Sequence, residues 1–164
     1  MNKSTANGSL AGLIERGGIY YNVSGSSPRE ILTKTIGLLP AFPSLKHETL
    51  LQAILEREAL MSTGIGKGIA IPHPRTPLLP EDESPFVALA FPVQPLDWNT
   101  PDGSKIHTIF LIVSASAKQH LSTLSRINFL CQQEKFYSLI KAQAPREAII
   151  AAIREAETGW ETVG

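Results

Sequence analysis

The segment from Ile106 to Val113 constrains the fold more than any other part of the sequence. It is Ile-His-Thr-Ile-Phe-Leu-Ile-Val, a nearly continuous apolar run. Such a run is typical of a strand that is buried on both faces, because a strand with one wet face alternates polar and apolar residues. We therefore expect a sheet that other layers cover on both sides. Shorter runs predict three more strands, at Ile19–Val23, Ile69–Ile71 and Phe86–Phe91.

Helices with clear start signals separate these predicted strands. Ser27-Pro28-Arg29-Glu30 combines a capping serine, a proline at the first helical position and a glutamate three residues after the cap. Ser116-Ala117-Lys118-Gln119 has the same capping pattern and predicts a helix that runs to about Gln133. Apolar spacing and flanking residues predict three further helices, at about His47–Leu60, Glu134–Lys141 and Pro145–Ala156.

The order of these elements predicts an α/β fold in which a mixed β-sheet is flanked by helices. The chain has 164 residues, which suits one domain with a full hydrophobic core. We expect this single domain to cover residues 10–164. Residues 1–9 lack core-forming side chains, so we expect a disordered start or an artificial junction there.

Charge and cysteine content argue against several classes of function. Fifteen basic residues balance fifteen acidic ones, whereas nucleic acids and anionic membranes require a basic surface. Cys131 is the only cysteine, so the chain forms no internal disulfide and suits a reducing cytosol. No secretory signal pattern is present, and no apolar run approaches the roughly 20 residues of a membrane-spanning helix. We expect a cytoplasmic protein with no nucleic-acid partner and no membrane insertion.

The stretch from Ser62 to Arg75 carries the strongest functional signal. Three glycines within five residues form a flexible or tightly turned entry to the short strand Ile69–Ile71. Pro72 should end this strand, because proline cannot donate to a strand ladder. His73 then stands at the strand's carboxyl end, between two prolines whose φ angles are fixed. A titratable nucleophile on a stiff loop is a candidate for chemistry.

The glycine order argues against nucleotide binding. A Walker A motif needs Ser or Thr after its Gly-Lys pair, and here Gly68 follows Lys67. A dinucleotide fingerprint places its glycines after a strand and before a helix, whereas these glycines precede a strand. A nucleophile elbow of the hydrolase type is also missing. The four histidines lack the i, i+4 spacing of a zinc helix, so the sequence predicts no metal site.

Two residues elsewhere strengthen the case for His73. His120 faces the apolar side of its helix near the first turn, where the helix dipole and free N–H groups favour anions. Arg57 and Glu58 close the helix before the glycines, near its apolar side, where charges need partners. A neutral imidazole can accept a phosphoryl group, and a guanidinium or a second imidazole can offset charge on its oxygens. These residues alone leave open the alternative of ordinary core or loop histidines.

Three segments together resemble the signature of phosphotransferase-system enzyme IIA, type 2, the fructose/mannitol/nitrogen-regulatory class. They are Arg57-Glu58, Ser62-Thr63-Gly64-Ile65-Gly66 and Gly68-Ile69-Ala70-Ile71-Pro72-His73. Asp102-Gly103 and His120-Leu121-Ser122-Thr123-Leu124 match further segments of the family, so the resemblance covers about residues 12–157. It implies an α/β sandwich, a cytoplasmic phosphocarrier, and neither a metal nor an organic cofactor.

The resemblance also implies a role for particular residues. His73 is expected to accept a phosphoryl group from an HPr-type phosphocarrier and to hold it as tele-phosphohistidine. His120 and Arg57 match the family's second histidine and its arginine, which lie beside the phosphorylated residue. The other ring nitrogen of His73 is expected to be held by a backbone carbonyl or a side chain. A phosphate-site loop is expected from the polar and glycine residues before the strand, Ser62, Thr63, Gly64 and Gly66.

Three functions stay open at this point. The chain carries no enzyme IIB or transporter segment, which favours a nitrogen-regulatory protein whose phosphorylation controls a target protein. The first alternative is a sugar-specific enzyme IIA that passes phosphate to an enzyme IIB cysteine for fructose/mannitol-type transport. The second is a non-catalytic interaction domain, although the presence of all three site residues argues against it. Pro74, the loop Pro77–Ser84 and His107 depart from the family pattern and leave the partner open.

Overall fold

The structure is a computed structural model that describes residues 8–163. Its helices are α2 (Leu10–Gly17), α3 (Pro28–Leu38), α4 (His47–Leu60), α5 (Ala117–Gln132), α6 (Glu134–Lys141) and α7 (Arg146–Val163). Its strands are β1 (Ile19–Val23), β2 (Gly64–Gly66), β3 (Ile69–Ala70), β4 (Phe86–Pro92) and β5 (Thr108–Val113). Within the described range, no helix combines the length and apolar character that crossing a membrane requires.

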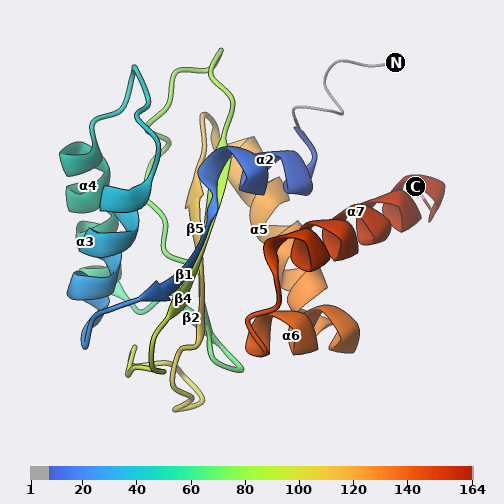
Figure 1. Cartoon of the computed structure of the whole chain (residues 1–164). Helices are drawn as coiled ribbons and strands as arrows, with labels where there is room; N and C mark the ends of the chain where they lie inside the picture. The colour runs from blue at the N-terminus through green and yellow to red at the C-terminus, as the bar shows by residue number, and fades with distance from the viewer. Residues whose placement is uncertain (1–7, 164) are drawn as a thin grey trace.

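The five strands form one mixed sheet in the order β1-β4-β5-β3-β2. The β1–β4 and β3–β5 pairs are parallel, and the β4–β5 and β2–β3 pairs are antiparallel. Helices α3 and α4 cover one face of the sheet, and α5, α6 and α7 lie on the other (Figure 1). The predicted α/β class, with a mixed sheet between helices, is confirmed.

Both faces of the two central strands contribute to the core, and every residue of β4 and β5 is buried. Successive side chains of a strand point to opposite faces. The core therefore has two parts, one on each face of the sheet. On the face covered by α2 and α5–α7, β4 contributes Val87, Leu89 and Phe91. On the face covered by α3 and α4, it contributes Phe86, Ala88 and Ala90. Burial on both faces explains why the sequence of these strands is an almost unbroken apolar run.

The sequence did not predict helix α2, which precedes β1. Ser9 caps it by accepting a hydrogen bond from the Gly12 N–H at 3.0 Å, although the prediction placed Ser9 in the disordered start. The carboxylate of Glu157 in α7 accepts hydrogen bonds from the N–H groups of Leu10 and Ala11, both at 2.9 Å. A contact between chain ends thus satisfies the first turn of this short helix. The remainder of the predicted disordered start, residues 1–7, lies outside the described residues.

Four helix and strand boundaries in the structure differ from the boundaries that the sequence predicted. Helix α7 continues past Ala156 to Val163, because Glu157 binds α2 and Trp160 packs against the Phe129 ring at 5.4 Å. Strand β4 includes Pro92 at its end, where the proline's missing N–H weakens the ladder least. Strands β3 and β5 are shorter than expected, ending at Ala70 and beginning at Thr108.

Candidate active site

The glycine stretch forms a β-hairpin at the edge of the sheet. Strands β2 and β3 are joined by Lys67 and Gly68, whose φ angles are 57° and 79°. Two successive positive φ angles are typical of the type I′ turn that suits a two-residue hairpin. A Cβ atom on Gly68 would lie 2.3 Å from the ring of His107, so the close packing also requires glycine. The expected turn is present, and it connects β3 to β2, the strand with which β3 pairs.

Hydrogen bonds at the end of β3 fix the backbone before His73 and the orientation of its ring. The Ile71 N–H donates to the Thr63 carbonyl, and the Ile112 N–H donates to the Pro72 carbonyl, both at 3.0 Å. Nδ1 of His73 lies 2.7 Å from the Ile71 carbonyl oxygen. A carbonyl oxygen only accepts hydrogen bonds, so Nδ1 carries the hydrogen and Nε2 keeps its lone pair. The expected backbone partner for one ring nitrogen is therefore present.

His120 lies beside His73, although 46 residues separate the two in the sequence. Their ring centroids are 4.5 Å apart and the ring planes are inclined at 43°. His120 belongs to the first turn of α5, which Ser116 caps by accepting from the Gln119 N–H at 3.1 Å. The side chain is half-buried, and Ile127 and Cys131 on the same face of the helix are fully buried. The inward direction predicted for His120 is confirmed.

Arg57 brings positive charge to this pair from the last turn of α4. Its Nη1 donates a hydrogen bond to the Met61 carbonyl at 2.7 Å. Burial lowers the pKa of His73; the hydrogen bond to Ile71 opposes this effect, and the charge of Arg57 adds to it. Burial also lowers the pKa of His120, and the charges of His73 and Arg57 lower it further. The structure thus places the two predicted histidines side by side, and the lowered pKa values favour neutral imidazoles near neutral pH.

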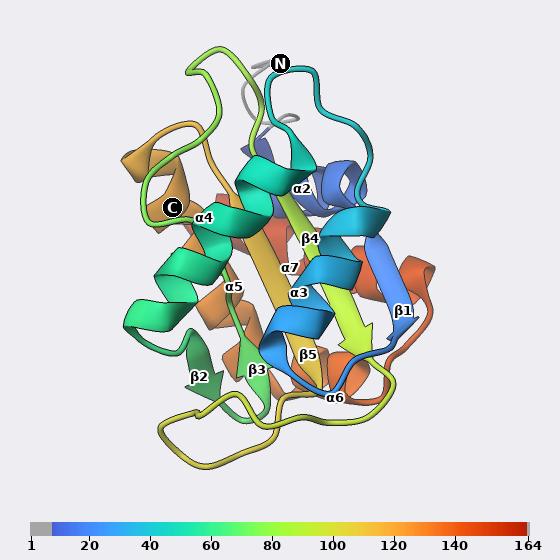
Figure 2. The ribbon, with the colours of Figure 1, turned by 90° about the vertical axis from the view of Figure 1, so that its left-hand side faces the viewer.

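Glu58 has the partner that its position near the apolar side of α4 required. Its carboxylate accepts hydrogen bonds from the N–H of Thr63, at 3.2 Å, and from the Thr63 hydroxyl. The Thr63 carbonyl in turn accepts from Ile71, two residues before the candidate nucleophile. Figure 2 shows the end of α4 leading directly to β2. Glu58 therefore fixes the end of α4 to the hairpin that carries His73.

The other residues expected in a phosphate-site loop have structural partners. Ser62 donates through its hydroxyl to the Trp98 carbonyl at 2.6 Å and accepts from the Gly64 N–H at 3.1 Å. Gly66 pairs with Ile69, at the end of β3 away from His73. These contacts build the hairpin. A direct role of Ser62, Thr63, Gly64 or Gly66 at a phosphate stays a prediction.

The remaining two histidines, His47 and His107, have structural partners. The ring of His107 lies 3.0 Å from the Lys67 carbonyl through Nε2 and 2.7 Å from the Thr108 hydroxyl through Nδ1. The ring of His47 lies 3.0 Å from the Pro40 carbonyl. Across residues 8–163, no group of three or more His, Cys, Asp or Glu side chains could hold a metal ion.

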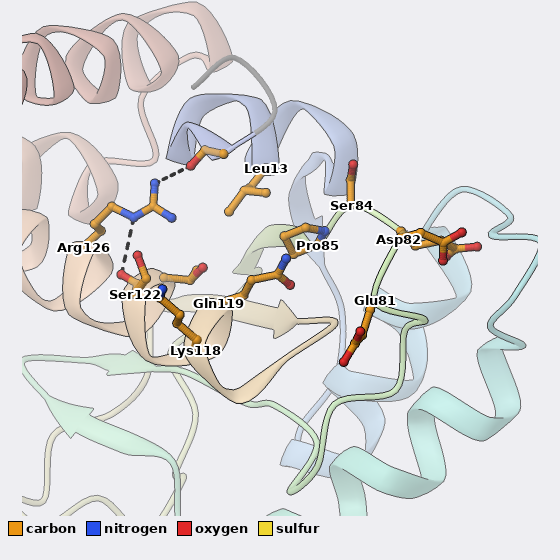
Figure 3. Close-up of a pocket in the computed structure, with 12 residues that line it drawn as sticks. Leu13, Glu81, Asp82, Ser84, Pro85, Lys118, Gln119, Ser122 and Arg126 are labelled. Atoms are coloured by element: carbon orange, nitrogen blue, oxygen red, sulfur yellow. Dashed lines mark hydrogen bonds between the residues drawn. The ribbon is translucent and has the colours of Figure 1, made fainter. Parts of the chain in front are cut away.

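A large cavity of about 650 Å³ lies next to α5, but it does not include the three site residues. Lys118, Ser122 and Arg126 line it from α5, Leu13 lines it from α2, and the loop 81–85 lines another side (Figure 3). His120 borders a much smaller cavity of about 70 Å³. The larger cavity lies away from His73, and the cavity beside His120 is smaller than the 300–1,000 Å³ or so of a typical small-molecule pocket. Neither cavity is a pocket for a small substrate at His73.

Comparison with known proteins gives a consistent result. Residues 13–156 match the family described as phosphoenolpyruvate-dependent sugar phosphotransferase system, EIIA 2. A nitrogen regulatory protein of Pseudomonas aeruginosa is 28% identical over 153 residues, which are 92% of this chain and 97% of the relative. The crystal structure of nitrogen regulatory protein IIA-Ntr from Neisseria meningitidis aligns with a TM-score of 0.72 and 26% identity, covering 82% of this chain and 92% of that one.

A third similarity concerns a complex. The structure of mannitol enzyme IIA with phosphorylated enzyme IIB from Escherichia coli aligns with a TM-score of 0.66, covering 84% of this chain and 94% of that one. Its identity of 14% supports a shared fold only. The family match covers most of the chain and agrees with the resemblance in the signature segments. The chain therefore belongs to the EIIA 2 family of the phosphoenolpyruvate-dependent sugar phosphotransferase system.

Proposed function

We propose that this protein is a phosphocarrier in which Nε2 of His73 accepts a phosphoryl group from an HPr-type phosphocarrier. The observation that carries this proposal is the hydrogen bond from Nδ1 to the Ile71 carbonyl at 2.7 Å. It fixes the tautomer in which Nε2 has a free lone pair, so phosphorylation at this atom gives the tele-phosphohistidine. No metal or organic cofactor takes part in the proposed reaction.

The neighbouring groups suit the charge that develops during an in-line transfer. As the bond from phosphorus to Nε2 forms, the bond to the donor's nitrogen breaks, and the donor imidazole keeps the electron pair. The transferred group carries its negative charge on three equatorial oxygens. The positive charge of Arg57 acts on both rings, and the centroid of the His120 ring lies 4.5 Å from that of the His73 ring. Both can donate hydrogen bonds to the phosphoryl oxygens.

Exposed apolar side chains beside the site residues support a protein as the donor. Leu60 and Met61 follow Arg57 at the end of α4 and are 64% and 71% exposed. Leu121 follows His120 and is 62% exposed. Exposed apolar groups around an open site are typical of a surface that binds another protein.

We favour the nitrogen-regulatory type, in which the phosphorylation state of one domain, residues 10–164, controls a target protein. The Pseudomonas aeruginosa relative supports this choice, since this chain matches 97% of its length. The second candidate is transfer from His73 to a cysteine of an enzyme IIB, which the solved mannitol enzyme IIA–IIB complex supports by analogy. The arrangement of His73, His120 and Arg57 argues against a non-catalytic interaction domain.

Incubation with labelled phosphoenolpyruvate, enzyme I and HPr is expected to label the protein at one histidine. The label should be lost in acid and retained in base, as expected for a phosphorus–nitrogen bond. His73→Ala should abolish it, because the accepting nitrogen is gone. His47→Ala is the matched control, since His47 lies at the start of α4 and its ring binds the Pro40 carbonyl. Retention of the label in His73→Ala would refute the proposal.

The same assay separates the two candidate functions. With a mannitol- or fructose-type enzyme IIB added, a transport component should lose its label to the IIB cysteine within the assay. A regulatory protein should keep the label on His73. The cysteine and histidine products differ in their stability in acid, so partial acid hydrolysis identifies the acceptor.

The imidazole of His73 is expected to titrate below its usual midpoint of about 6.5. Burial disfavours the imidazolium, and the charge of Arg57 adds to this effect. His73 should therefore stay neutral and nucleophilic from pH 8 to about 6.5 and lose activity only at lower pH. Because the unfolded chain takes up the proton first, the free energy of unfolding should also fall below about pH 6.5. An NMR titration of the ring measures the midpoint, and a value above that of the unfolded chain would contradict this expectation.

A further inference from the structure

The cavity of about 650 Å³ beside α5 has the size of a typical pocket for a small molecule, about 300–1,000 Å³. It lies between α5, α2 and the loop 81–85. Lys118, Ser122 and Arg126 line it from one face of α5, because residues four apart lie above one another on a helix (Figure 3). The proposed phosphoryl transfer does not use this cavity.

Arg126 is a partly buried cation in the wall of this cavity. Its side chain is 24% exposed, and burial lowers its pKa, an effect that the charge of Glu157 opposes. Nη1 donates to the Gly8 carbonyl at 2.6 Å, which leaves further N–H groups of the guanidinium available. The Glu157 carboxylate lies 3.9 Å away and already accepts from two N–H groups of α2. Since a buried charge needs opposite charge close by, an anion in the cavity would stabilise Arg126.

Lys118 adds a second positive charge to the same face of α5. It precedes Arg126 by eight residues, so the two Cα atoms lie about 12 Å apart along the helix. Lys118 is exposed, and within residues 8–163 its side chain has no hydrogen bond and no ion pair. Between the two cations, Ser122 offers a hydroxyl group and Gln119 offers its NH₂ group, since Oε1 of Gln119 already accepts from the Ala115 N–H.

The acidic residues of the loop 81–85 do not neutralise these two cations. The Glu83 carboxylate accepts a hydrogen bond from the Ser44 hydroxyl. The Asp82 side chain points away from α5 (Figure 3). Across the described part of the chain, no ion pair joins this loop to α5. Glu81 lines the opposite side of the cavity, so an anion is expected to lie along α5.

We propose that this cavity binds an elongated organic dianion whose two acidic groups are joined by a hydroxylated chain. One acidic group binds the guanidinium of Arg126, and the other binds the ammonium of Lys118. The hydroxyl groups of the ligand bond Ser122 and Gln119. A phosphorylated sugar acid has this chemistry, with a phosphate at one end and a carboxylate at the other. The inference does not depend on phosphorylation of His73.

Calorimetry with four probes tests the chemistry of the ligand. 6-Phosphogluconate carries both acidic groups and should bind with a Kd below about 1 mM. Glucose 6-phosphate, gluconate and inorganic phosphate each lack one end of the dianion and should bind at least about tenfold more weakly. In NMR spectra, 6-phosphogluconate should shift the amide signals of residues 118–126. Failure of 6-phosphogluconate to bind, or equal binding of all four probes, would overturn the inference.

Two lysine variants test the place of binding. Lys118→Gln should keep the wild-type Tm, because the side chain is exposed and unpaired, and should weaken the binding of 6-phosphogluconate about tenfold. Lys105→Gln is the matched control, since Lys105 is an exposed lysine in the loop before β5 and does not line the cavity. Equal Kd values for the two variants would show that any binding lies elsewhere or reflects net charge. Calorimetry uses no phosphate donor, so its outcome is separate from the labelling of His73.

Discussion

Replacing Arg57 with alanine is expected to slow phosphoryl acceptance by His73 about 100- to 1,000-fold. The charge of Arg57 lowers the pKa of both imidazoles, so we expect its guanidinium to face the negative charge that spreads over the transferred oxygens. We expect an effect of this size because preorganised charge is the main contribution that a protein makes to phosphoryl transfer. The single-turnover rate with phospho-HPr measures the effect directly.

Two further variants test whether charge or local structure is responsible. Arg57 also donates to the Met61 carbonyl, so its loss removes one hydrogen bond at the end of α4, worth about 1 kcal/mol. Arg57→Lys keeps the positive charge but loses the planar guanidinium, which can donate two parallel hydrogen bonds. Its rate should lie between those of wild type and Arg57→Ala. Arg29→Ala removes an exposed arginine at the start of α3 and should leave the rate unchanged. A rate for Arg57→Ala within twofold of wild type would exclude a role for this guanidinium in the transfer.

Gly17→Ala is expected to destabilise the protein by about 3 kcal/mol. Gly17 ends α2 and packs directly on the backbone of β4. A Cβ atom there would lie 2.2 Å from the Val87 carbonyl oxygen and 2.8 Å from the Ala88 nitrogen. These are backbone atoms of a central strand, which cannot rotate away as a side chain can. Helix α2 would have to move off the sheet, and its buried residues Leu10 and Leu13 would lose part of their packing.

Urea unfolding of Gly17→Ala and Gly37→Ala measures this effect against a matched control. Gly37 lies in α3 and is exposed, and a methyl group added to its Cα would have no neighbouring atom within 4 Å. Alanine is the better helix former, so Gly37→Ala should raise the free energy of unfolding by about 0.5–1 kcal/mol. If both variants unfold at the same urea concentration, the close approach of α2 to β4 does not limit stability.

The sequence predicted much of the fold because many of the signals are local. The caps at Ser27 and Ser116 and the helix over His47–Leu60 lie where the sequence placed them. Such signals act over three or four residues, so a linear pattern contains them fully. Helix α2 was missed because it has only eight residues, and its first turn is satisfied by Glu157, 146 or more residues away.

The sequence also named His73, His120 and Arg57 as candidates, but their proximity is a tertiary property. His73 follows β3, and His120 lies in the first turn of α5, which follows β5. The two meet because β3 and β5 are parallel neighbours whose ends point the same way. The glycines were expected to form a flexible or tightly turned entry to the strand before His73, and in the structure they belong to a hairpin at the edge of the sheet.

Residue types and spacing therefore determined which elements form and which side chains could accept or stabilise a phosphoryl group. Only the tertiary structure showed which group leaves Nε2 of His73 free, namely the carbonyl of Ile71 that binds Nδ1, and which charges shift the pKa of the ring. The physical reason is that burial and hydrogen-bond geometry depend on segments that are distant in the sequence and meet only when the core packs.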